Sequence, residues 1–448
     1  MKINEHPTVL AVRGNPTPPS ATKSPATRVL DDKWLRNLCR EAGADDVGFV
    51  SIDNPDMAEQ RDIILYAFAH ARSLVSYACR LNPESIRSPA RSLAQLEFSR
   101  GTGRINEVGR AIAANLATAG VAALHIPATF PMEIENFPDR QPWVIGHKPV
   151  AVAAGLGRIG RNRLVLHPRF GAFMVLGTVL VDASVITYGE KLAFSPCLDC
   201  NACTAVCPVG AVGAEGQFDF SSCYANCYRY SLTGFGDWVE RLADSPNRFA
   251  YRRRVDDSET SAVWQGLTTG PIYRTGYCMA VCPAGEDVIV PFLTDRARFA
   301  REVVTPLREK KERVYVVAGS DAESYATLNF PHKELRRIDN GLRAQSIASF
   351  LQGARLKFQR RKAEGLAITV HFTFTGREER KASMLIRDGS LEVAEGHVGI
   401  VDVAVRADSE AWLKVLAGEW SMLGAILRGK VRVKGKVRLL RRFGESFV

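Results

Sequence analysis

The chain has 448 residues, of which 46% are hydrophobic and 24% charged, with 36 Gly and 22 Pro. At roughly 150 residues per domain this length predicts about three domains, and the composition excludes an intrinsically disordered or collagen-like chain. Lys and Arg outnumber Asp and Glu by 59 to 48, so the formal net charge of +11 favours anionic partners such as phosphates, acidic proteins or lipid headgroups.

The N-terminal segment is rich in Pro, Ser and Thr, and we expect residues 1–28 to form a disordered tail. It shows neither the charged and apolar regions of a signal peptide nor a twin-arginine pair. No run of about 18 uninterrupted apolar residues occurs anywhere in the chain. The sequence therefore predicts a cytoplasmic protein with no membrane span.

Residues 29–190 alternate helix-like segments with short apolar strands, which predicts an α/β or α+β domain. Asp31 or Asp32 can cap a helix that continues to about Ala42, and a strand follows near residues 47–52. Further helices are expected at 55–72 and 104–119, and further strands at 73–79 and 121–126. Cys39 lies in the first predicted helix and Cys79 in a predicted strand, so we expect both to be buried small hydrophobic residues rather than ligands.

Residues 155–160 read Gly-Leu-Gly-Arg-Ile-Gly, which fits the GxGxxG pattern of dinucleotide-binding loops, and Asp182 lies about twenty residues beyond. That pattern requires a helix that opens at the third glycine. Here a short segment leads to His167 and Pro168, after which a strand is predicted, so no room is left for the crossover helix. We therefore expect no dinucleotide site at this motif.

Eight of the ten cysteines fall within residues 197–282, and this clustering in a chain without a secretion signal indicates metal binding rather than disulfides. Cys197 opens a CxxCxxCxxxCP segment, which is typical of bacterial ferredoxins. In that pattern three thiolates bind one cluster and the fourth cysteine binds the other. Downstream, Cys278 and Cys282 repeat only the CxxxCP half, so two further cysteines must complete the second ligand set.

We assign the eight cysteines to two [4Fe–4S] clusters of four ligands each. The first set is Cys197, Cys200, Cys203 and Cys282, and the second is Cys207, Cys223, Cys227 and Cys278. A pair of zinc sites is the alternative, because zinc also takes four thiolates. Residues 191–290 therefore predict a ferredoxin-like module with two clusters, many turns and little periodic secondary structure.

The remaining chain divides into two parts. Residues 291–345 carry charged runs around one apolar strand and are expected to form a structured linker with solvated faces. From residue 346 to 448 long alternating strands appear, followed by a helix from about Ser409 to Ala417. This part predicts a separate sheet-plus-helix domain.

Residues 31–290 resemble the epoxyqueuosine reductases and the related reductive dehalogenases. The resemblance lies in HKPVAVAAGLGRIGRN, PRFGAF and LGTVLVDA, followed by CxxCxxCxxxCP and the split second motif. It implies a nitroreductase-like domain at 29–190 that holds base-off cobalamin, with two clusters that feed electrons to the cobalt. It also implies that Gly155, Leu156, Gly157, Gly160 and Asn162 shape the cofactor pocket; a tight glycine turn is the alternative.

The chain departs from that family in three ways. The family has an acid about fourteen residues before GLG, where this chain has Gln141, so Asp139 is the candidate proton donor. The second cysteine motif lacks the family's CxxC. The C-terminal helical repeats that read tRNA are missing, and tRNA is therefore not an expected partner.

Residues 346–448 resemble sterol carrier protein-2 (SCP2) domains. Asp402, Trp412, Gly429, Lys430 and Gly435 carry this resemblance. It implies an apolar tunnel that holds or delivers a lipid-like molecule. The alternative is a domain used only for packing or dimerisation.

Together these features predict a multidomain α/β and α+β iron–sulfur reductase. Electrons from a ferredoxin or flavodoxin-like donor would pass through two [4Fe–4S] clusters to a corrinoid that reduces a small or hydrophobic substrate. A non-catalytic electron-transfer or lipid-binding protein is one alternative. A flavin-dependent reductase without cobalamin is the other.

Overall fold

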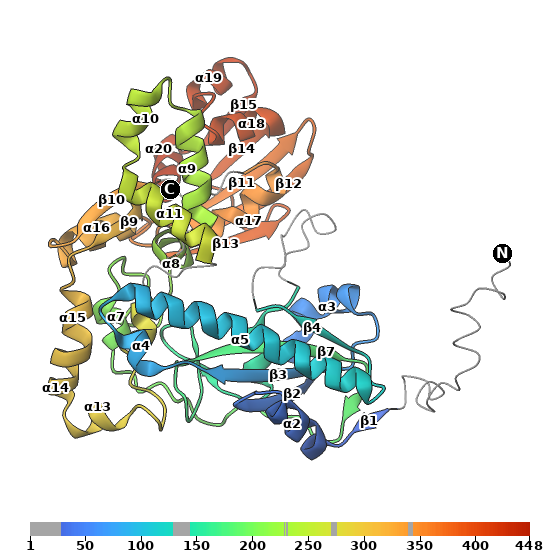
Figure 1. Ribbon diagram of the computed structural model, residues 1–448. Helices are drawn as coiled ribbons and strands as arrows, with labels where there is room; N and C mark the ends of the chain where they lie inside the picture. The colour runs from blue at the N-terminus through green and yellow to red at the C-terminus, as the bar shows by residue number, and fades with distance from the viewer. Residues whose placement is uncertain (1–27, 129–143, 228, 230–231, 270–275, 339–343) are drawn as a thin grey trace, which may run out of the picture.

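A computed structural model describes residues 28–128, 144–227, 229, 232–269, 276–338 and 344–448. The architecture is mixed α/β with several domains (Figure 1). An N-terminal sheet and a C-terminal sheet are separate, and the cysteine-bearing segments lie between them in the chain.

The N-terminal domain is built on a four-stranded sheet of order β2-β3-β7-β4, in which all neighbours are antiparallel. Its strands are β2 (Asp46–Ser51), β3 (Ser73–Arg80), β7 (Met174–Val181) and β4 (Ala123–Ile126). Two short strands, β1 (Val29–Leu30) and β8 (Ser184–Val185), form a parallel pair beside it.

Both faces of this sheet are covered, because the side chains of β3 alternate between two apolar layers. Val75, Tyr77 and Cys79 pack in the layer that contains the long helix α5 (Arg91–Thr118), which crosses the sheet in Figure 1. Leu74 packs on the opposite face, in the layer that contains α6 (His147–Ala153). The remaining helices of the domain are α2 (Asp32–Glu41), η4 (Pro55–Gln60), α3 (Arg61–Ala67) and α4 (Pro83–Arg87).

The local predictions for this domain are largely confirmed. Asp31 caps α2 by accepting a hydrogen bond from the backbone N–H of Trp34. Cys39 and Cys79 are fully buried, and burial raises their thiol pKa values to about 12 and about 11. The helix predicted at 104–119 instead begins at Arg91, whose buried guanidinium stacks on the ring of Tyr277, a tertiary contact that local patterns do not reveal.

The GxGxxG segment does not form a dinucleotide loop. It follows α6, a helix, rather than a strand. The short strand β5 (Arg158–Ile159) pairs antiparallel with β6 (Val165–Leu166), so a tight hairpin occupies the place of the crossover helix. The prediction that no crossover helix opens at the third glycine is confirmed.

The expectation of little periodic structure between residues 191 and 290 is wrong for the segment between Cys227 and Cys278. Helices α9 (Leu232–Ala243), α10 (Arg248–Arg254) and α11 (Asp257–Thr269) occupy it. The shorter helices α7 (Ala202–Val206), α8 (Phe220–Cys227) and α12 (Tyr277–Ala280) carry or border the cysteines.

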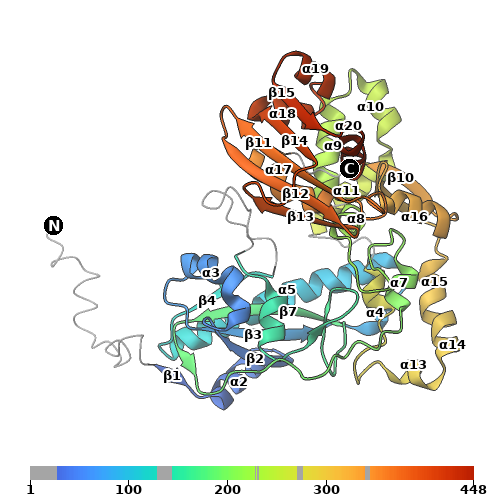
Figure 2. The same cartoon turned by 180° about the vertical axis from the view of Figure 1, so that it is seen from behind.

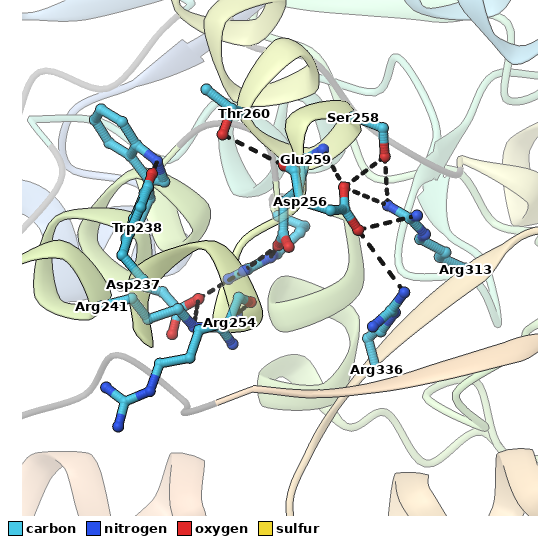
Figure 3. Close-up of polar contacts among 12 residues, drawn as sticks. Asp237, Trp238, Arg241, Arg254, Asp256, Ser258, Glu259, Thr260, Arg313 and Arg336 are labelled. Atoms are coloured by element: carbon cyan, nitrogen blue, oxygen red, sulfur yellow. Dashed lines mark hydrogen bonds and ion pairs between the residues drawn. The ribbon is translucent and has the colours of Figure 1, made fainter. Parts of the chain in front are cut away.

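Buried ion pairs hold this helical insertion together, which explains why apolar periodicity missed it. Arg229 is 1% exposed and binds Asp237 at 2.6 Å and Glu259 at 2.5 Å. Asp256 binds Arg313 at 3.1 Å and so connects the insertion to the next segment, as Figure 3 shows. Ion pairs between charged side chains therefore connect these helices to each other and to the next segment, a role that apolar contacts have in most helices.

The segment 291–345 is not an isolated connection. Its helical part runs along one edge of the molecule in both views (Figure 2) and consists of α13 (Val290–Thr294), α14 (Arg296–Phe299), the π-helical turn η5 (Ala300–Val304) and α15 (Thr305–Arg308). Parallel strands β9 (Arg313–Val317) and β10 (Glu334–Ile338) follow, joined by α16 (Asp321–Asn329). Val314 and Ala322 pack with Val209, next to Cys207 and Cys223, so this unit builds the core behind those cysteines.

The C-terminal domain is a five-stranded sheet of order β13-β12-β11-β14-β15, with β11 and β14 parallel and the other pairs antiparallel. Its strands are β11 (Ile368–Thr375), β12 (Arg380–Arg387), β13 (Ser390–Glu395), β14 (Val403–Asp408) and β15 (Val431–Gly435). Its helices are α17 (Ile347–Lys357), α18 (Ser409–Leu416), α19 (Met422–Leu427) and α20 (Val437–Glu445). The predicted alternating strands and the helix from Ser409 are confirmed.

Among the described helices, none combines the length and the apolar character needed to cross a membrane.

Candidate functional site

The four cysteines of the first predicted set line a single pocket. Three come from the loop and helix at 197–203, and Cys282 follows α12, far away in the chain. The loop turns tightly because Asp199 and Asn201 adopt left-handed backbone conformations, with φ of 49° and 58°. The pocket is thus closed by two distant chain segments.

The four cysteines of the second set also gather, and each of them is partly buried. Cys223 and Cys227 lie one turn apart on α8, and their sulfurs are 3.7 Å apart. Among the nearby charged groups, Cys227 and Cys207 have the largest electrostatic effect on the pKa of Cys278. Three segments of the chain therefore meet at this group.

Burial and interactions between neighbouring thiols raise the pKa values of five of these cysteines, which favours their protonated form when they carry no metal. Burial, with smaller contributions from nearby thiolates, raises the pKa of Cys203 to about 11 and that of Cys282 to about 12. The pKa values of Cys207 and Cys278 are raised by burial, and that of Cys223 chiefly by its hydrogen bond with Cys227. Bound metal would reverse this preference, since its positive charge stabilises thiolates and releases their protons.

Within the described residues, no three His, Cys, Asp or Glu side chains are close enough together to ligate a single metal ion. In a four-iron cluster each thiolate binds a different iron, so its ligands need not converge on one point. Both sets of cysteines fit a cluster in this respect, because each set brings together four thiols from distant segments of the chain.

The glycine segment before these cysteines packs against its own chain. Gly155 has φ of +80°, and a Cβ there would lie 2.6 Å from the carbonyl oxygen of Glu190. A Cβ on Gly157 would lie 2.5 Å from the carbonyl oxygen of Leu166, and one on Gly160 would lie 2.5 Å from the Leu166 side chain. Leu156 is buried in a small apolar cluster. These contacts account for the glycines as a tight turn, and their role at a cofactor stays a prediction.

The end of that turn reaches the cysteines. Asn162 is 5% exposed, donates a hydrogen bond to the backbone carbonyl of Cys278 at 3.2 Å, and lines the first pocket. Arg161 lines the same pocket. Sequence reasoning included Asn162 but missed Arg161, although its position between Gly160 and Asn162 was a usable signal.

A second contact fixes the CxxxCP loop to the N-terminal domain. The amides of Glu286 and Asp287 donate to the carbonyls of Pro168 and Arg169 at 3.0 Å each. Gly171 has φ of +59°, and a Cβ there would lie 1.7 Å from the carbonyl oxygen of Ala284. This close approach holds Cys282 in place against the first domain.

Two cations lie near the cysteines. Arg87 lies near Cys282 and between the rings of Phe173 and Phe299. The Lys148 ammonium donates to the carbonyl of Arg163 at 2.9 Å; burial lowers its pKa, while Cys278 and Cys223 raise it. These residues are scattered in the sequence, so no motif identifies them.

The candidate proton donor Asp139 lies outside the described residues. Near the end of that gap, His147 makes a hydrogen bond with Thr178 at 2.9 Å. Burial lowers the pKa of His147 to about 4, so this imidazole is neutral at pH 7.

The residues that carry the C-terminal resemblance mostly support the fold. Asp402 accepts the backbone N–H of Thr369, Lys430 pairs with Asp408 at 3.1 Å, and a Cβ on Gly435 would lie 2.3 Å from the carbonyl oxygen of Asp402. Trp412 differs from these. It lies in the apolar core, and its Nε1–H is buried without an acceptor among the residues that the structure describes.

Comparison with known proteins gives matches to both halves of the chain. Residues 350–447 match the SCP-2 sterol transfer family. The epoxyqueuosine reductase of Staphylococcus aureus is 35% identical over 80 residues, which are 18% of this chain and 20% of that protein. The epoxyqueuosine reductase of Bacillus cereus is 24% identical over 184 residues, which are 39% of this chain and 41% of that protein. The chain therefore spans about a fifth to two fifths of the length of these relatives.

Two solved structures show the same resemblance at lower similarity. Epoxyqueuosine reductase from Streptococcus thermophilus has 15% identity and a TM-score of 0.32, over 61% of this chain and 74% of that one. A catabolic reductive dehalogenase has 18% identity and a TM-score of 0.37, over 61% of this chain and 34% of that one. The curated relatives confirm the resemblance to epoxyqueuosine reductases, and the family match confirms the resemblance of residues 350–447 to SCP2 domains.

The expectation that tRNA is not a partner is wrong. The curated relatives are epoxyqueuosine reductases, and one similar solved structure is an epoxyqueuosine reductase with an epoxyqueuosine-modified tRNA-Tyr stem loop, at 15% identity and a TM-score of 0.28 over 44% of this chain and 58% of that one. The expectation rested on missing C-terminal repeats. Loss of one RNA-reading unit does not remove the electrostatic attraction of a chain with net charge +11 for phosphates.

Proposed function

We propose that this protein is an iron–sulfur oxidoreductase in which two [4Fe–4S] clusters form an electron path to a reaction site in the N-terminal domain. The observation that carries the proposal is the gathering of eight cysteines into two groups of four. The cysteine pocket borders the N-terminal domain through Arg161, Asn162 and Leu166. The matches to epoxyqueuosine reductases support the same class of activity.

The chain's own residues position the two groups relative to each other. Asn162 lines the first pocket and holds the backbone of Cys278, a residue of the second group. Cys278 and Cys282 flank the end of α12, only four positions apart in the chain. The clusters would supply one-electron transfer. The protein would set the direction of this transfer, because burial, charge and hydrogen bonds determine the reduction potential of each cluster.

The acceptor of these electrons is proposed to be a corrinoid, on the strength of the resemblance in residues 147–182. The glycines of that segment pack against their own chain and offer no open cradle. A corrinoid would therefore have to contact other parts of the domain. Cobalt content and corrinoid uptake distinguish this proposal from a flavin-dependent reductase or an electron-transfer protein without cobalamin.

The C-terminal domain is proposed to hold an apolar molecule that carries a hydrogen-bond acceptor. Its interior is aromatic, with Phe350, Phe372 and Phe374 around Trp412. A buried N–H without an acceptor is costly, and a ligand oxygen would satisfy the indole of Trp412. Such a molecule would be delivered to, or kept near, the reductase part of the chain.

An anaerobic reduction assay tests the proposal. The protein, purified with supplied cobalamin, is given dithionite and a substrate panel that contains an epoxyqueuosine-bearing tRNA stem loop and small hydrophobic compounds. We expect corrinoid uptake and turnover of at least one substrate class. A Cys282→Ala variant serves as the inactive control, and failure to bind corrinoid in an iron-loaded protein would contradict the corrinoid part.

A further inference from the structure

The guanidinium of Arg161 occupies an unusual position at the first group of cysteines. The side chain is 15% exposed and lines the pocket formed by Cys197, Cys200, Cys203 and Cys282. Its Nη2 binds Asp199 at 2.9 Å, but Nε and Nη1 are buried without an acceptor in the described part of the chain. A cation with unused donors thus lies beside four thiols.

Asp199 does not neutralise this cation well. The carboxylate is 72% exposed, so water screens its charge, whereas the guanidinium is largely buried. Asp199 also lies on the tight turn between Cys197 and Cys200. The ion pair therefore orients Arg161 toward the cysteine loop and leaves most of its charge uncompensated.

A cluster with four thiolate ligands would use both properties of Arg161. The cluster becomes more negative when it gains an electron, and a nearby positive charge stabilises the reduced form. Hydrogen bonds to the cluster sulfurs act in the same direction, and the two unused N–H groups can make them.

We propose that Arg161 sets the reduction potential of the first cluster, as a fixed positive charge and as a donor to its sulfurs. This inference rests on the proposed function. Arg161 would thereby favour electron arrival at the cluster of the cysteine pocket. The second group has cations of its own nearby: Lys148, which donates to the carbonyl of Arg163, and Arg91, whose guanidinium stacks on the ring of Tyr277.

A redox titration of the holoprotein tests this inference. Dithionite supplies one electron to each cluster, and EPR spectra of frozen anaerobic samples follow the two reduced clusters separately. We expect Arg161→Gln to make reduction of one cluster at least tenfold less favourable, a shift of about 59 mV to lower potential for a one-electron couple. The other cluster keeps its potential.

Three further variants separate charge from structure. Arg161→Lys keeps the charge and should retain most of the wild-type potential. Asp199→Asn removes the opposing carboxylate and should shift the same cluster to higher potential. Arg110→Gln is the matched control, because this arginine is 72% exposed on α5 and its ion pair is with the exposed Glu107.

The outcomes distinguish this inference from the proposed function. The inference is wrong, and the proposed function stands, if Arg161→Gln retains both clusters with unchanged reduction potentials. It is also wrong if Arg161→Lys lowers the reduction potential of the cluster as much as Arg161→Gln does. If the wild-type protein holds no iron and labile sulfide, the proposed function itself fails.

Discussion

The two groups of cysteines differ in how the chain assembles them. The first draws three of its four members from one short loop, opens to a pocket and has Arg161 beside it. The second draws its members from the end of α7, from α8 and from α12, and a helical insertion separates Cys227 from Cys278. One CxxCxxC segment supplies most of the first group, whereas the second group needs three separate segments that the tertiary fold brings together. The second group should therefore be the more sensitive to changes far from the cysteines.

The largest effect is expected from removing a ligand of the second group. Cys278→Ala should lower the iron content from about eight to about four per chain, because the cluster that three chain segments hold together loses one of its four ligands. The protein should also unfold at lower temperature, since Cys278 lies on α12 between the core residues Tyr277 and Met279. Cys39→Ala is the control, because Cys39 is buried outside both groups and should retain all the iron. Full iron in Cys278→Ala would contradict the assignment of this residue.

Breaking the ion network of the insertion should affect the second group without touching a cysteine. Arg229→Ala leaves Glu259 buried without its cation and Asp237 with Arg241 alone, which should cost about 3–5 kcal/mol in the free energy of unfolding. Chemical denaturation measures this loss, and Arg248→Ala, on the exposed side of α10, is the control. A loss below about 1 kcal/mol would show that the insertion does not depend on this network.

The first group has its own distant support at Gly171. Gly171→Ala places a methyl group against the carbonyl of Ala284 at a positive φ, which should cost about 2–3 kcal/mol of stability. Because this loop holds Cys282, the cluster of the cysteine pocket should be lost first on exposure to a chelator. Gly353→Ala on α17 is the control, since a Cβ there meets nothing within 4 Å. Equal loss of both clusters would argue against separate supports.

The smallest effect is a pH dependence that belongs to neither group. Burial lowers the pKa of His147 to about 4. Between about pH 6.5 and pH 4, this imidazole is therefore protonated in the unfolded chain but neutral in the folded chain. Stability should therefore fall as pH drops from about 6.5 toward 4, by about 1.5 kcal/mol between pH 6.5 and pH 5. His147→Gln should flatten this part of the stability curve. An unchanged slope in that variant would assign the pH dependence to another residue.

Sequence patterns predicted the parts of the fold that rest on local rules. Alternating apolar residues predicted the strands of the C-terminal sheet, and Asp31 predicted the start of α2. The helices α9–α11 were missed, because Arg229, Asp237 and Glu259 rather than an apolar stripe hold them. The early start of α5 was missed because Arg91 stacks on Tyr277, which is far away in the sequence.

The candidate site shows the same division. Cysteine spacing alone predicted two groups that the fold brings together. The cations Arg87 and Lys148 could not be predicted, since their positions beside the cysteines arise from packing between distant segments, whereas Arg161 adjoins the predicted Asn162. The tight turn at Gly155 and Gly157 was an open alternative, and only its contacts with Glu190 and Leu166 gave it a structural explanation.

The most direct test of the two-cluster account is the iron and acid-labile sulfide content of the protein purified without oxygen. The account predicts about eight irons and about eight sulfides per chain, together with two EPR signals after reduction. Zinc without labile sulfide, or iron for one cluster only, would contradict it.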